Sequence, residues 1–130
     1  MEKARILLVE DNLEILRLLQ LLLQAEDFAV EAVEDAETAC DLLKEQAPDL
    51  LITDLMMPRV GGLDLIRWAR RTPALAELPV IALSAYERTY HKAALMAGAD
   101  VVLEKPDDFG ALTETIRKLL ADRKPAWPAA

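Results

Sequence analysis

Four apolar runs in the sequence are each followed by polar side chains that could do chemistry together. These side chains are Glu10 and Asp11, Asp54, Ser84 and Lys105. Three carboxylates brought close together repel one another and need an offsetting positive charge. A divalent cation with oxygen ligands would supply it, and Mg²⁺ favours carboxylates, waters and phosphate oxygens. The hydroxyl and the ammonium group could hold a phosphoryl group, so the set suits phosphoryl transfer to a carboxylate.

The elements that must position these residues follow from the hydrophobic pattern. Short apolar runs predict strands at residues 6–9, 28–33, 50–54, 80–83 and 101–103, and amphipathic segments predict helices around residues 15–23, 36–43, 62–71, 88–97 and 109–120. In the first helix the spacing of Ile15, Leu18, Leu19, Leu22 and Leu23 predicts a buried stripe. Strands that alternate with helices predict an α/β fold.

The expected architecture is a doubly wound, five-stranded parallel sheet with five helices, of the flavodoxin-like kind. A sheet of this size most often has the strand order 2-1-3-4-5, with a crevice between strands 1 and 3. Right-handed crossovers make all five strands point the same way, so their carboxyl ends meet at one edge. The chemically capable residues are therefore expected around that crevice. The run at 28–33 has Glu31 among its apolar residues, which predicts a strand near the edge of the sheet.

Size and composition limit the classes of protein that fit. The 130 residues are expected to form one domain over residues 1–122, with residues 123–130 as a flexible tail or the start of a linker. The net charge of −8 argues against direct binding of nucleic acid. The apolar runs are too short for a signal peptide or a membrane span, and Cys40 is the single cysteine, so we expect a soluble, cytoplasmic protein without disulfides.

Taken together, the motifs resemble the receiver domain of two-component response regulators. The resemblance rests on Glu10-Asp11-Asn12, Asp54 with Met57-Pro58 and Gly61-Gly62, Ser84-Ala85 and Lys105-Pro106, and it covers about residues 4–120. It implies that Asp54 accepts a phosphoryl group from a phosphohistidine on a sensor histidine kinase or a histidine phosphotransfer protein. It also implies that Asp11 binds Mg²⁺ directly, that Glu10 assists through water, and that the backbone carbonyl of Met56 completes the protein ligands. Ser84 and Lys105 would then hold the transferred phosphoryl group.

Two departures from the pattern of this family affect the expected phosphorylation switch. The switch position, usually aromatic, is Val102, so the coupled movement of a ring with Ser84 is expected to be altered or absent. Met56 and Tyr86 flank the expected phosphoryl site, and neither is an acid or an amide that would orient an attacking water. We therefore expect a signalling switch and not an enzyme, one that catalyses only its own phosphotransfer from phosphohistidine and slow self-dephosphorylation. The family's output surface would signal to a downstream protein partner. Here it would be formed by the fourth helix (residues 88–97), the fifth strand (residues 101–103) and the fifth helix (residues 109–120). It could also form a homodimer. Receivers that dimerise through this surface resemble one another in carrying matched acids and arginines. This chain has Asp100 and Arg117, but Thr115 stands where a further arginine would be expected.

Several alternative functions remain open from the sequence. The chain could be the N-terminal receiver fragment of a longer regulator or of a hybrid kinase, or a receiver-like interaction module that is never phosphorylated. A phosphatase of the haloacid dehalogenase type also phosphorylates an aspartate at a strand end. It would need a second aspartate two residues after Asp54, where this chain has Met56.

Overall fold

The computed structural model describes residues 2–85, 88–104 and 109–122. In chain order its elements are β1 (Arg5–Val9), α1 (Leu13–Ala25), β2 (Ala29–Val33), α2 (Ala36–Glu45), β3 (Leu50–Asp54), α3 (Gly62–Arg71), the 3₁₀ turn η1 (Pro73–Leu75), β4 (Val80–Ser84), α4 (Arg88–Ala97), β5 (Val101–Glu104) and α5 (Phe109–Asp122). The strands alternate with the helices as the sequence predicts. Each predicted strand is found within one residue of its expected position at either end.

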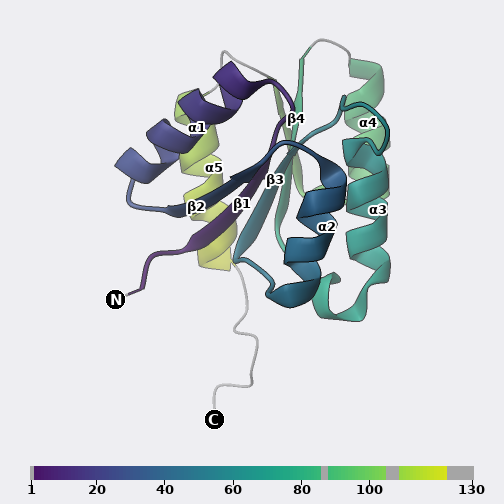
Figure 1. Ribbon diagram of the computed structural model, residues 1–130, viewed down its shortest axis with the longest axis horizontal. Coiled ribbons are helices and arrows are strands. Elements are labelled where there is room, and N and C mark those ends of the chain that lie inside the picture. Colours follow the sequence, from purple (N-terminus) through teal and green to yellow (C-terminus); the bar gives the residue numbers. More distant parts are fainter. Residues whose placement is uncertain (1, 86–87, 105–108, 123–130) are drawn as a thin grey trace.

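The sheet is parallel throughout, in the order β2-β1-β3-β4-β5. Both the fold class and the strand order predicted from the sequence are thus confirmed. Helices α1 and α5 cover one face, and α2, α3 and α4 cover the other (Figure 1). The predicted position of β2 at an edge is also confirmed.

Alternation along the central strands divides the core into two layers. In β1, Ile6 and Leu8 join the apolar cluster on the side of α1 and α5, while Leu7 and Val9 join the cluster on the side of α2, α3 and α4. Every residue of β3 and β4 is buried, as expected of strands covered on both faces. The buried middle of the sheet therefore ends at Asp54 and Ser84, and it fixes the backbone positions of these two residues.

Helix α1 departs from its predicted burial. Leu16, Leu19 and Leu23 are buried, whereas Leu18 is 45% exposed and Leu22 is 38% exposed. The predicted stripe is therefore wrong at these two positions. The buried residues still recur at three- and four-residue spacing, but the stripe is rotated relative to the predicted one.

The helices begin and end where the local chemistry favours it. The Asn12 side chain caps α1 by accepting the N–H groups of Glu14 and Ile15 at 3.0 and 3.2 Å. Gly98 follows α4 with φ at +123°, a conformation that glycine adopts readily. Within the part of the chain that the structure describes, no helix has the length and apolarity needed to cross a bilayer.

Candidate functional site

The acidic residues predicted to meet do so at the carboxyl edge of the sheet. Glu10 comes directly after β1, Asp11 follows it, and Asp54 is the last residue of β3. One carboxylate oxygen from each lies within 4.8 Å of the others. Glu10 and Asp54 are buried, at 0% and 2% exposure, while Asp11 is exposed. Two acids thus form the floor of the cluster and the third faces solvent.

Backbone hydrogen bonds orient the two buried carboxylates. The N–H of Asn12 donates to Oε2 of Glu10 at 3.1 Å, just before α1 begins. The N–H of Met56 donates to Oδ1 of Asp54 at 3.3 Å. Each of these bonds uses one of the roughly four acceptor positions of its carboxylate. The orientation therefore costs the cluster little of its capacity to bind a cation.

The backbone around Asp54 depends on a close approach of α3. A Cβ placed on Gly62 would lie 2.0 Å from the carbonyl oxygen of Asp54, so this position needs glycine. The N–H of Gly62 donates to the carbonyl of Leu55 at 3.1 Å, and the hydroxyl of Thr53 donates to the Asp54 carbonyl at 2.9 Å. In the sequence Gly61-Gly62 is part of the receiver-like motif, but the motif does not reveal this contact, which depends on the path of the backbone.

Ser84 lies on the strand next to Asp54. It ends β4, it is 2% exposed, and it follows Leu83, whose Cα is the partner of Asp54 in the sheet. Ser84 is therefore a buried residue at the end of the strand next to β3, and its role in holding a phosphoryl group stays a prediction. Val102 lies in β5 opposite Ala82 and is half-buried against the cluster formed with α3 and α4.

The other predicted site residues have mixed outcomes. Met56 is described and is 55% exposed at the rim. Lys105 and Tyr86 lie outside the described residues, as does the tail predicted at residues 123–130. The two charged residues considered for dimerisation have partners within the chain: Arg70 contacts Asp100 at 3.1 Å, and Arg117 contacts Glu26 at 2.7 Å. A homodimer stays a prediction.

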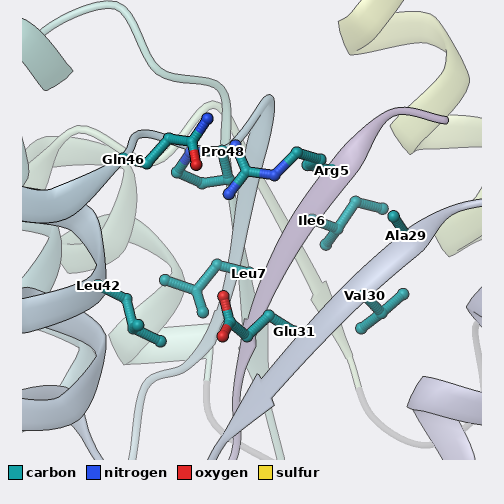
Figure 2. Close-up of a pocket in the computed structure, with 9 residues that line it drawn as sticks. All are labelled: Arg5, Ile6, Leu7, Ala29, Val30, Glu31, Leu42, Gln46 and Pro48. Carbon is teal, nitrogen blue, oxygen red and sulfur yellow. The ribbon is translucent and has the colours of Figure 1, made fainter. Parts of the chain in front are cut away.

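An open groove of about 310 Å³ lies at the opposite edge of the sheet (Figure 2). The first residues of β1 and β2 and the C-terminal part of α2 line it, including Arg5, Glu31 and Leu42. Because the strands are parallel, this groove and the three acids lie at opposite ends of β1. The groove is therefore not part of the acidic site.

The donor set at the acidic site fits a hard divalent cation. It consists of carboxylate oxygens, it combines a buried floor with an exposed third acid, and it gathers like charges that a cation would offset. Phosphate oxygens and waters would complete the coordination of Mg²⁺.

Comparison with known proteins shows which family the chain resembles. The family model for the response regulator receiver domain matches residues 6–117. The response regulator MprA of Mycobacterium tuberculosis is 36% identical over 123 residues, which cover 94% of this chain and 53% of that protein. MprA of Mycobacterium avium is 36% identical over 122 residues, with 93% and 53% covered. The chain thus spans about half the length of these curated relatives.

Solved structures give the same result. The signal receiver domain of a signal transduction histidine kinase from Syntrophus aciditrophicus superposes with a TM-score of 0.86 at 30% identity, covering 98% of both chains. The receiver domain of NtrX from Brucella abortus gives a TM-score of 0.83 at 26% identity, covering 91% of this chain and 99% of that one. The fold, the convergent acids and these likenesses lead to one conclusion: the chain belongs to the receiver domain family of response regulators.

Proposed function

We propose that Asp54 accepts a phosphoryl group from a phosphohistidine, in a reaction that needs Mg²⁺ held by Glu10, Asp11 and Asp54. The observation that carries this proposal is the gathering of the three carboxylates within 4.8 Å around a strand-end aspartate. The phosphodonor would be a sensor histidine kinase or a histidine phosphotransfer protein. A bound Mg²⁺ would offset the charge of the carboxylates and of the phosphoryl oxygens.

The transfer forms one bond and breaks another. A carboxylate oxygen of Asp54 forms a bond to phosphorus, while the bond between phosphorus and the imidazole nitrogen breaks. The nitrogen keeps the electron pair, and the imidazole leaves uncharged when its other ring nitrogen carries a proton. The N–H of Met56, bonded to Oδ1 at 3.3 Å, orients the carboxylate for this attack. We expect the backbone carbonyl of Met56 to serve as a further metal ligand, and Ser84 and Lys105 to hold the transferred group.

Phosphorylation would act as a switch. A phosphoryl group adds roughly −1.5 to −2 charge, by analogy with other phosphorylated side chains. Ser84 ends the strand that leads toward α4, so it could transmit this change to the surface formed by α4, β5 and α5. A protein partner would read that surface. Because the chain spans about half of its curated relatives, which are response regulators, it could act as the receiver part of a longer regulator.

The phosphoryl group is expected to be lost slowly. Met56 is apolar and 55% exposed at the rim, so it offers no acid or amide to orient a water for attack on phosphorus. Tyr86 is the second residue expected to flank the phosphoryl group, and it too is neither an acid nor an amide that would orient a water. Loss of the added mass can be followed after excess phosphodonor is removed, with Mg²⁺ present. A half-life of seconds would contradict the expectation.

Acetyl phosphate and intact mass spectrometry test the phosphoacceptor. We expect the chain to gain one phosphoryl group in the presence of Mg²⁺ and the Asp54→Ala variant to gain none. Asp64→Ala is the matched control, because Asp64 is an exposed acid in the first turn of α3, and it should behave as the native chain. An unmodified native chain would instead favour a receiver-like interaction module.

A further inference from the structure

The side chain of Arg70, next to the last residue of α3, ties several segments together. Only 20% of this side chain is exposed. Nε donates to the carbonyl of Gly98 at 2.9 Å, and Nη2 donates to Oδ2 of Asp100 at 3.1 Å. Nη1 donates to three carbonyls around the end of η1, those of Leu75, Ala76 and Leu78, at 3.3, 3.1 and 2.7 Å. The planar guanidinium group, with donors fixed in a fork, is suited to this role.

Gly98, directly after α4, is shaped around Arg70. Its φ of +123° favours glycine, and a Cβ there would lie 2.4 Å from Cγ of Arg70. The N–H of Gly98 also donates to the carbonyls of Ala94 and Leu95 at 3.2 and 3.1 Å. The end of α4 and the Arg70 side chain therefore occupy adjoining space that leaves no room for either to shift toward the other.

Asp100 connects the same point to the sheet. Its carboxylate accepts the N–H of Val80 at 2.8 Å as well as Nη2 of Arg70, and its own N–H donates to the carbonyl of Val80 at 2.9 Å. Hydrogen bonds with a charged partner are stronger than neutral ones. The start of β4, the end of α3 and the turn between α4 and β5 are thus joined through Arg70 and Asp100.

The first half of α4 differs from its end. His91 has its ring nitrogen Nε2 buried, with no hydrogen-bond partner among the described residues. A buried polar atom without a partner costs free energy, whereas the carbonyl of Gly98, directly after the helix, accepts Nε of Arg70. A rearrangement of α4 can therefore lower the free energy more in the first half of the helix than at its end.

We propose that Arg70 is a positioning residue that holds the C-terminal end of α4 in place, so that α4 responds to a charge on Asp54 by pivoting about Gly98. The inference rests on the proposed function, because the charge comes from phosphorylation. Movement is confined to the part of α4 nearest Ser84. The end bonded to Arg70 stays where it is, and the partner surface changes mainly at the start of α4.

Amide hydrogen exchange measured by NMR, with and without acetyl phosphate and Mg²⁺, tests the pivot. In the native chain we expect phosphorylation to change exchange at residues 90–94 and to leave the amides of Gly98 and Asp100 unchanged. In Arg70→Met the change should extend to both of these amides. Arg67→Met is the matched control, because Arg67 is an exposed arginine of α3 paired only with Asp64 among the bonds described, and it should behave as the native chain.

A second arm does not need phosphate. Without acetyl phosphate, Arg70→Met should raise exchange at the amides of Gly98 and Asp100 by about tenfold or more, since it removes hydrogen bonds to a charged group. Arg70→Lys keeps the charge but loses the forked set of N–H donors, so its effect on exchange should be intermediate. This variant also serves as the test if Arg70→Met does not fold. Equal exchange in the native chain and in both variants would overturn the role of Arg70.

The mass of the same samples separates the two proposals. If no phosphoryl group is added, the proposed function fails and the pivot fails with it. If the group is added and the native amides of Gly98 and Asp100 change as much as residues 90–94, only the pivot is overturned.

Discussion

The two edges of the sheet handle charge in opposite ways. At the carboxyl edge, Glu10, Asp11 and Asp54 bring three carboxylate oxygens within 4.8 Å of one another. At the amino edge, acids lie against bases and backbone N–H groups: Asp100 contacts Arg70 at 3.1 Å, and the Arg5 N–H donates to Asp49 at 2.7 Å. One edge gathers like charges, and the other joins segments through opposite charges.

The difference shows which charges bind ligands and which stabilise the fold. Parallel topology brings strand ends together at both edges, so proximity alone does not make a site. Charges that satisfy one another lower the free energy of the folded state. Like charges held together raise it unless a cation offsets them, and such local conflicts are expected at functional sites.

The largest expected effect comes from Gly62 at the carboxyl edge. Gly62→Ala would place a Cβ 2.0 Å from the carbonyl oxygen of Asp54, which is backbone that cannot easily yield. We expect a loss of at least about 3 kcal/mol in the free energy of unfolding, or failure to fold. Urea unfolding measures it.

Gly110→Ala is the matched control. A Cβ on Gly110, an exposed residue of α5, would meet no non-neighbouring atom of the described residues within 4 Å. It should stabilise the helix by about 0.5–1 kcal/mol, because alanine restricts the unfolded chain more than glycine does. Equal stability of the two variants would contradict the close approach of α3 to Asp54.

A smaller effect, of opposite sign, is expected from Asp54→Asn. Removing one of three like charges should raise the free energy of unfolding by about 1 kcal/mol in the presence of EDTA, which is less than the full Coulomb repulsion at this separation because of solvent screening. Mg²⁺ should stabilise the native chain as its concentration rises, and the variant much less. Urea unfolding with EDTA and with excess MgCl₂ gives both values. If the variant is less stable in EDTA, the carboxylates do not repel as proposed.

An effect of similar size concerns Asp35, an acid that also follows a strand. It caps α2 by accepting the N–H of Thr38 at 2.6 Å, and this bond lowers the pKa of Asp35 below its ordinary value. Asp35→Ala should cost about 1 kcal/mol at neutral pH. Because the folded pKa is the lower one, this stabilisation is complete above the ordinary carboxyl pKa, and it is lost as the pH falls through the folded value.

Thermal unfolding between neutral and acid pH measures the contribution of Asp35. Asp41→Ala, an exposed acid in the middle of the same helix, is the control and should show no such loss. A stability difference between native chain and Asp35→Ala that persists unchanged in acid would rule out the capping carboxylate as its cause.

The fold could be predicted from the sequence because the central strands are apolar on both faces. The run that ends at Asp54 is fully buried, so its length and its end are unambiguous. Helix α1 was harder to predict, because leucines occur around most of its circumference. Leu18 and Leu22 fit a stripe as well as Leu16 does, and only the packing against β1 and α5 decides which of them is buried.

The site was predictable in its residues and less so in its supports. Parallel strands gather whatever follows them, which is why Glu10, Asp11 and Asp54 could be placed together in advance. Their supporting contacts could not be predicted. The contact of Gly62 with the Asp54 carbonyl depends on how the backbone returns to the strand, and the bonds of Arg70 reach residues 28 and 30 positions away.

The central claim is that the gathered charges serve phosphorylation of Asp54, and locating the phosphoryl group tests it most directly. The chain is incubated with acetyl phosphate, with Mg²⁺ or with EDTA. The acyl phosphate is then reduced with borohydride, which converts the modified aspartate to homoserine, and peptides are sequenced by mass spectrometry. We predict homoserine at position 54 alone, and only with Mg²⁺. Modification at another carboxylate, or equal modification at Asp54 in EDTA, would contradict the account.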